Sequence, residues 1–163
     1  MIGPIPAATV VDVGCGTGLN FMGLRELVGP TGRVVGIDAS PSMLAVAQRR
    51  VKRADWSNVT TVCGDIHELL PALERVDIRH DDIDVLVATF VITTIQDDAK
   101  FWATVDQLCR DRQRLVAVAD LGQPSSIGSA RRLALRALAA LGGSHPTCEP
   151  WKDLAAQIGR AHV

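Results

Sequence analysis

The 163-residue sequence contains no tyrosine, and it has only three tryptophans and three phenylalanines. The absence of tyrosine removes one common acid–base side chain from the catalytic candidates. The four cysteines, Cys15, Cys63, Cys109 and Cys148, are far apart and form no Cys-x-x-Cys pair. With four scattered histidines they suggest no zinc site, so no metal is expected. We expect reduced thiols packed in or near the core of a cytoplasmic protein.

Strong charge and long apolar runs are also missing. The formal net charge is −1 and the isoelectric point is about 6.4, so nothing directs the chain to nucleic acid or to an anionic membrane surface. No apolar run reaches the length of about 18 residues that a membrane span needs, and the first residues lack a signal pattern. The hydrophobic fraction of 47% is enough for a core, and the length predicts a single domain over residues 1–163.

A glycine-rich turn dominates the start of the chain, where residues 9–20 read T-V-V-D-V-G-C-G-T-G-L-N. The β-branched run before it favours a buried strand. Gly14, Gly16 and Gly18 allow a tight turn in which the backbone approaches a ligand, and an apolar helical pattern follows. A helix in that position directs its free N–H groups back toward the turn. The pattern therefore predicts a strand, a binding turn and a helix.

The identity of the ligand depends on more than the glycines. The dinucleotide fingerprint has a third glycine where this chain has Leu19, and Asp12 lies inside the end of the strand. The run instead resembles motif I of the class I S-adenosylmethionine-dependent methyltransferases. That resemblance implies a turn wrapped around the methionine part of S-adenosyl-L-methionine. The residues it implies are Asp12, Gly14, Cys15, Gly16, Thr17 and Gly18.

A second acid follows the next predicted strand, in the run G-I-D-A-S-P-S-M-L. Asp38 comes about 20 residues after the glycine turn, the distance at which such folds place an acid beside the ribose. Ser40 as N-cap and Pro41 as first helical residue indicate a helix start, so Asp38 could alternatively serve that helix terminus. The family resemblance implies that Asp38 binds the ribose, with Ala39 and Met43 beside the cofactor.

A third acid follows the third predicted strand as Gly64-Asp65-Ile66. The resemblance implies that Asp65 accepts from the adenine amino group and that Ile66 packs on the ring. The structural alternative is a turn aspartate that caps a helix over residues 67–73. We expect His67 to be an exposed residue of that helix.

The fourth predicted strand, residues 83–90, is nearly all apolar, as expected for a central parallel strand. Its end lies at the same sheet edge, which places Thr89 and Phe90 near the reactive methyl group. The Asn/Asp-Pro-Pro-aromatic tetrad of amino-methylating enzymes is absent. The following V-I-T-T-I resembles the small-molecule, quinone-biosynthesis-like branch, which often carries histidines where this chain has Thr93 and Thr94. The sequence therefore identifies no catalytic base.

Strands and helices alternate along the chain, which predicts a doubly wound, Rossmann-like, mostly parallel sheet in a three-layer α/β/α arrangement. Strands are expected at 9–13, 33–37, 59–63, 83–90 and 115–119, and helices at 18–28, 41–54, 67–73, 98–110, 125–141 and 151–158. The first helix should bury Leu19, Met22, Leu24 and Leu27. Compared with the family, the last strands and the N-terminal helices look cut away. We therefore expect 115–119 to be an exposed sheet edge that pairs in a homodimer.

The leading hypothesis is methyl transfer from S-adenosyl-L-methionine to a small-molecule acceptor. His145, Cys148 and Glu149 are candidates for the acceptor pocket. A second hypothesis is a non-catalytic cofactor-binding fragment of a methyltransferase. A third, an NAD or nucleotide-sugar enzyme, is disfavoured by Leu19 and by the Gly64-Asp65 pair.

Overall fold

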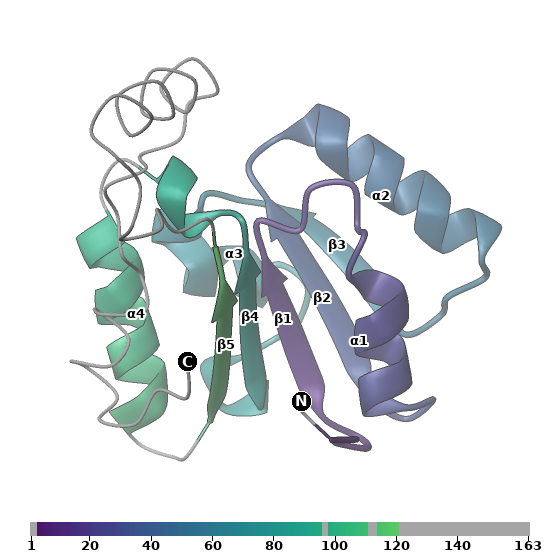
Figure 1. Ribbon diagram of the computed structural model, residues 1–163, viewed down its shortest axis with the longest axis horizontal. Helices are drawn as coiled ribbons and strands as arrows, with labels where there is room; N and C mark the ends of the chain where they lie inside the picture. The colour runs from purple at the N-terminus through teal and green to yellow at the C-terminus, as the bar shows by residue number, and fades with distance from the viewer. Residues whose placement is uncertain (1–2, 96–97, 111–113, 121–163) are drawn as a thin grey trace, which may run out of the picture.

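The computed structural model describes residues 3–95, 98–110 and 114–120, which form a five-stranded sheet flanked by helices (Figure 1). The strands are β1 (Thr9–Val13), β2 (Arg33–Asp38), β3 (Val59–Cys63), β4 (Val85–Thr89) and β5 (Leu115–Ala119). Every pairing is parallel and the order is β3-β2-β1-β4-β5. The strand order reverses between β1 and β4, so the predicted doubly wound topology is confirmed.

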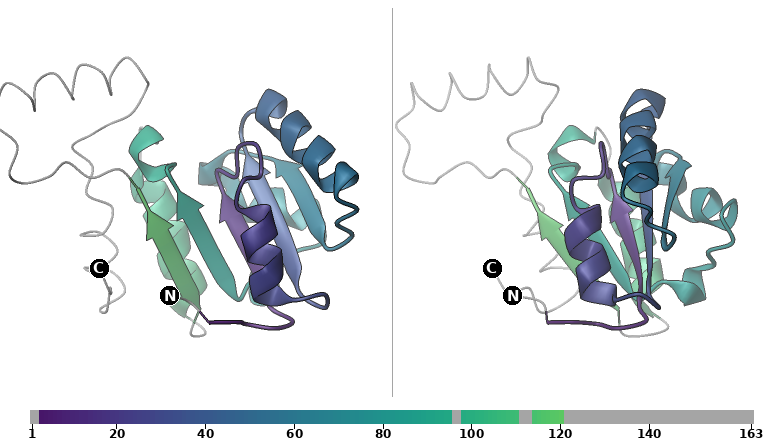
Figure 2. Two further views of the ribbon diagram at one scale, coloured as in Figure 1. Left: turned by 45° about the vertical axis from the view of Figure 1, so that its right-hand side comes forward. Right: turned by 90° about the vertical axis from the view of Figure 1, so that its right-hand side faces the viewer.

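The helices lie on both faces of the sheet (Figure 2). They are α1 (Phe21–Val28), α2 (Pro41–Arg53), α3 (Leu69–Glu74) and α4 (Asp98–Arg110), and three 3-10 turns join them to the strands: η1 (Ile66–Glu68), η2 (His80–Asp82) and η3 (Ile92–Thr94). The α1 and α2 helices cover one face, whereas α3 and α4 cover the other. This confirms the three-layer architecture. The helices expected at 125–141 and 151–158 lie outside the described residues.

Two hydrophobic clusters hold the layers together, one on each face of the sheet. Phe101 and Trp102 of α4 belong to the first cluster, and their rings meet edge to face with centroids 5.1 Å apart. Phe21 of α1 and Leu44 of α2 belong to the second. All five residues of β1 are buried, because this strand is central and covered on both faces. Full burial of each of its three valine side chains contributes about 1.5–3 kcal/mol.

The first helix differs from its prediction in start and in phase. It begins at Phe21 and buries Phe21 and Val28, whereas Leu19 and Met22 are 73% and 60% exposed. The glycine turn extends to residue 20, and Gly18 has a φ of +73°. A Cβ atom on Gly18 would lie 2.5 Å from the Phe21 ring, so that ring takes the inward position beneath the turn. The expected burial of Leu19 and Met22 is wrong for this reason.

The fourth strand is shorter than predicted and ends at a backbone outlier. It covers Val85–Thr89 in place of residues 83–90, and two residues separate it from η2. Phe90 leaves the strand with a φ of +55°, which is uncommon for a bulky residue. Its backbone N–H donates to the Ala119 carbonyl over 2.8 Å, which ties the ends of β4 and β5 together. The predicted bounds of β1, β3, β5 and α4 agree with the structure.

Candidate functional site

A cavity of about 480 Å³ opens at the carboxyl ends of the central strands. This is the edge where ligands bind in open α/β sheets, and the volume is in the range of small-molecule sites. It is lined by Val13, Gly14, Ile37, Asp38, Ala39, Gly64, Asp65, Ile66, His67, Val91, Thr94 and Ile95. Five residues predicted from the sequence motifs thus line one cavity: Gly14, Asp38, Ala39, Asp65 and Ile66.

The glycine turn forms one wall of the cavity. Gly14 and Gly16 have φ values of +66° and +53°, in the left-handed region that favours glycine. A Cβ atom on Gly14 would lie 2.3 Å from the side chain of Val91, so that position has no room for a side chain. A Cβ atom on Gly16 would meet nothing within 4 Å. The space beside Gly16 can therefore receive a ligand close to the backbone.

Asp38 connects the turn to the next helix. One carboxylate oxygen, Oδ2, accepts from the Gly16 backbone N–H over 2.8 Å, and the other, Oδ1, accepts from the Ser40 N–H over 2.8 Å. The Ser40 hydroxyl in turn accepts from the Met43 N–H over 3.4 Å, which is the predicted N-cap of α2. Each carboxylate oxygen has about two acceptor directions, so Asp38 retains capacity for two further donors.

Asp65 lies across the cavity at the end of β3. Its Oδ1 accepts from the His67 backbone N–H over 2.8 Å and so caps η1, which is the structural alternative considered from the sequence. The helix after it starts at Leu69, later than predicted. His67 lies on η1, is half-buried and lines the cavity, so the expectation of an exposed helical residue is wrong.

Asp12 is buried beneath the turn and belongs to a polar cluster. The Asn20 side-chain Nδ2 donates toward both carboxylate oxygens of Asp12, over 3.2 and 3.3 Å, and to the Thr89 hydroxyl oxygen over 2.8 Å. Asp12 is at the end of β1 and Thr89 at the end of β4, and these strands are neighbours. Burial raises the pKa of Asp12 to about 6; the Asn20 hydrogen bond opposes that rise, whereas the charge of Asp38 adds to it.

The other predicted residues surround the cavity without lining it. Cys15 is buried, and burial, with the nearby Asp12 and Asp38 charges, raises the pKa of its thiol. The Thr17 carbonyl accepts from Arg50 Nε of α2 over 3.2 Å. The Gly18 N–H donates to the Cys15 carbonyl over 2.9 Å, which closes the turn. Met43 is 46% exposed and Phe90 is 63% exposed.

Several cavity residues were not identified from the sequence motifs. Val91, Thr94 and Ile95 follow β4 and reach the cavity through η3, a turn with no sequence signature. The sequence analysis considered Thr94 only as a position where related enzymes often carry a histidine. It did not predict that Thr94 lines the cavity. Asn20 was read as part of the glycine-turn run without a role. His145, Cys148 and Glu149 lie outside the described residues.

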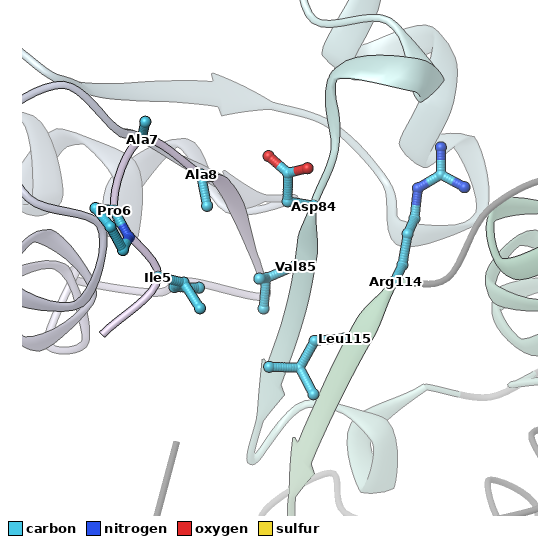
Figure 3. Close-up of a pocket in the computed structure, with 8 residues that line it drawn as sticks. All are labelled: Ile5, Pro6, Ala7, Ala8, Asp84, Val85, Arg114 and Leu115. Carbon is cyan, nitrogen blue, oxygen red and sulfur yellow. The ribbon is translucent and has the colours of Figure 1, made fainter. Parts of the chain in front are cut away.

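A larger cavity, of about 700 Å³, lies at the opposite end of the sheet, where β1, β4 and β5 begin (Figure 3). Leu115 is turned into it, whereas the Arg114 guanidinium points away. Arg114 donates to the carbonyls of Ile83 and His80, each over 2.8 Å. The Asp84 carboxylate accepts from the Thr9 N–H over 2.9 Å. The carboxyl-end cavity is the stronger candidate for a polar ligand, because it holds the two motif carboxylates Asp38 and Asp65 and lies at the edge where open α/β sheets bind ligands.

Within the part of the chain that the structure describes, no group of three histidine, cysteine, aspartate or glutamate side chains could hold a metal ion. No helix in that part is long and apolar enough to cross a membrane.

Comparisons with known proteins identify relatives of the chain. An arsenite methyltransferase of Halobacterium salinarum is 27% identical over 118 residues, which are 72% of this chain and 28% of that protein. A demethylmenaquinone methyltransferase of Oceanobacillus iheyensis is 27% identical over 120 residues, which are 74% of this chain and 47% of that protein. The chain therefore spans less than half the length of either relative.

The fold also matches solved structures. Phosphoethanolamine N-methyltransferase 2 of Haemonchus contortus, in complex with S-adenosyl-L-methionine, superposes with a TM-score of 0.70 at 18% identity and covers 97% of this chain and 33% of that chain. Residues 6–130 match the methyltransferase domain family. The chain therefore belongs to this family, and its resemblance to class I S-adenosylmethionine-dependent methyltransferases is confirmed.

Proposed function

We propose that the protein transfers a methyl group from S-adenosyl-L-methionine to a small-molecule acceptor. The observation that carries the proposal is the carboxyl-end cavity, which unites Gly14, Asp38 and Asp65 from three separate strand ends. Family membership and the names of the relatives support the same reaction.

The residues present fit this cofactor. The ribose offers two hydroxyl donors, and Asp38 retains two acceptor directions beyond its bonds to Gly16 and Ser40. The adenine offers an amino donor, and Asp65 has a second carboxylate oxygen at the cavity wall. The methionine part carries an ammonium group, for which Asp12 is the buried acid of the glycine turn. Ala39 and Ile66 supply apolar wall beside the adenosine.

The bound cofactor supplies an electrophilic methyl group on a sulfonium. The chain's own task is then to hold the acceptor in line with that methyl group, at about 3 Å, and to exclude water. Thr89 and Phe90 lie at the end of β4 beside the turn, and we propose that they face the reacting groups. An acceptor that is already an anion needs no protein base, which agrees with a motif set that contains none.

The relatives are named for arsenite, demethylmenaquinone and phosphoethanolamine, which are chemically different small acceptors. Their names support a small-molecule acceptor and do not choose among the classes. A second candidate function is cofactor binding without methyl transfer.

The test is calorimetric titration with S-adenosylhomocysteine, with NAD as the competing ligand. We expect micromolar binding of S-adenosylhomocysteine and none of NAD. Asp38→Ala should weaken binding at least about tenfold, because a hydrogen bond to a charged group contributes about 1.5–3 kcal/mol. Glu26→Ala removes an exposed carboxylate from α1 and should leave affinity unchanged. Equal affinity in wild type and Asp38→Ala would reject the ribose assignment, and binding with no turnover of any acceptor would favour the second candidate.

We also propose a cytoplasmic protein that forms a homodimer through β5. In the described part of the chain β5 is hydrogen-bonded to β4 alone, which leaves an edge that a second copy can extend. Cys15, Cys63 and Cys109 are free, as in a reducing compartment. Light scattering after size-exclusion chromatography should give twice the chain mass of 17.4 kDa. A strictly monomeric profile would contradict the dimer.

A further inference from the structure

Asn20 precedes α1 but does not act as its N-cap. Asparagine is among the most favoured N-cap residues, because its side chain can accept from the first free N–H groups of a helix. Here the Asn20 backbone has φ −76° and ψ −20°, which is already helical, and its side chain makes no capping hydrogen bond within the described residues. The helix therefore gives no reason for an amide at this position.

The Asn20 amide instead joins the ends of two neighbouring strands. Its Nδ2 atom lies 3.2 and 3.3 Å from the carboxylate oxygens of Asp12 and 2.8 Å from the Thr89 hydroxyl oxygen. An amide nitrogen has two hydrogens, one for each neighbour. The nitrogen must face Asp12, because an ionised carboxylate accepts only and would repel the amide oxygen.

This contact determines the state of both partners. The Thr89 hydroxyl oxygen accepts from Asn20, so its own hydrogen is directed elsewhere. Asp12 has 0% of its surface exposed, and the Asn20 amide is its only side-chain hydrogen-bond donor in the part of the chain that the structure describes. A buried carboxylate with a single neutral donor is poorly compensated, and a cation that binds next to it would be stabilised.

We propose that Asn20 is a positioning residue that keeps Asp12 ionised and Thr89 oriented for the cationic methionine part of the cofactor. This inference rests on the proposed function. Asn20 does not itself contact the reacting atoms; it acts through Asp12 and Thr89. The amide thereby couples the cofactor turn to the end of β4, where the acceptor would enter.

The charged and titratable groups that face Asp12 define the test. They are Asp38 at the end of β2 and Cys15 in the turn, and both remain unchanged when Asn20 is replaced. Asn20→Asp keeps the shape of the side chain but replaces the donor with a like charge, which should raise the pKa of Asp12 further. Asn20→Ser removes the amide and adds no charge. It should shift the pKa in the same direction by less.

The experiment measures two quantities between about pH 5 and about pH 9, a range that spans the titration of Asp12. The first is affinity for S-adenosylhomocysteine by calorimetry; the second is the Asp12 carboxyl carbon shift by NMR. In the wild type both should have a midpoint near pH 6, the pKa of Asp12. In Asn20→Asp the midpoint should rise by at least about one pH unit, and affinity at pH 7 should fall at least about twofold, because the ionised fraction of Asp12 at that pH falls by about half.

Asn58→Asp is the matched control. It makes the same amide-to-carboxylate change at the other end of the sheet, where the Asn58 Nδ2 donates to the carbonyls of Gly29 and Gly32 and its Oδ1 accepts from Arg25 Nε over 2.7 Å. A merely structural loss would lower stability in both variants without moving either midpoint. If Asn20→Asp does not fold, Asn20→Ser decides the outcome by the same two midpoints.

Three results would overturn the proposal. An unchanged Asp12 midpoint in the folded variants would show that Asn20 does not control this acid. A shifted Asp12 midpoint with affinity equal to the wild type would show that the control has no bearing on the cofactor. Failure of the wild type itself to bind S-adenosylhomocysteine, with the NMR midpoint still shifted, would refute the proposed function and with it the positioning role.

Discussion

Replacement of Asp12 by asparagine should make the protein more stable at neutral pH while it weakens cofactor binding. Asp12 is fully buried, and burial raises its pKa from 3.8 to about 6. That difference corresponds to about 3 kcal/mol, at about 1.4 kcal/mol per pKa unit. Because the folded state binds the proton more tightly than the unfolded state, the stability is greatest when Asp12 is protonated. It is lost as the pH rises from 3.8 through about 6.

The assay is urea unfolding of the wild type and Asp12→Asn across pH. The asparagine is neutral throughout and can still accept from the Asn20 amide. Subtraction of the two stability curves cancels every other titrating group that the substitution leaves alone. Between about pH 4.5 and about pH 7.5 the advantage of the variant should grow by about 2 kcal/mol, and the remainder lies at lower pH.

A difference curve that stays flat over this range would refute the reasoning. It would mean that water or a cation reaches the Asp12 carboxylate in the folded protein, so that burial does not penalise its charge. A curve that grows in the opposite direction would mean that the ionised carboxylate is stabilised by more than the Asn20 amide.

Three further substitutions and one chemical modification test the turn, the rim and the cysteines. Gly14→Ala should lower the free energy of unfolding by about 3 kcal/mol, because the new Cβ atom would lie 2.3 Å from a methyl group of Val91. Gly16→Ala should lower it by only about 1 kcal/mol, because the left-handed backbone alone opposes the alanine. Equal losses in urea unfolding would contradict the packing argument. Phe90→Gly should raise stability by up to about 1 kcal/mol, because it relieves a φ of +55° at an exposed ring, yet reduce turnover; a clear loss of stability would show that the ring packs. Iodoacetamide should modify exposed Cys63 in the native protein but spare Cys15, because burial raises the pKa of the Cys15 thiol. Mass spectrometry of peptides would measure both modifications, and faster modification of Cys15 than of Cys63 would contradict the prediction.

The local pattern of the sequence was sufficient for the elements and their type. The valines of β1, the Ser40-Pro41 start of α2 and the apolar spacing of α4 are signals that act within a few residues, so they do not depend on the rest of the fold. Because parallel strands align their carboxyl ends, the sequence also predicts that Asp12, Asp38 and Asp65 lie at one edge of the sheet. In the structure all three acids lie at that edge. Asp38 and Asp65 line the cavity, and Asp12 is buried beneath the glycine turn.

Only the tertiary structure decided the details that depend on distant neighbours. Phe21, and not Leu19 or Met22, turns inward because Gly18 and the sheet leave room there for one ring. Phe90 takes a left-handed backbone at the point where its N–H donates to Ala119 of another strand. Asn20 gives up its helix cap because Asp12 and Thr89 lie within hydrogen-bond reach, and Thr89 is 69 residues away in the chain. Such contacts join residues that no local pattern relates, since their energies exist only after the sheet has formed.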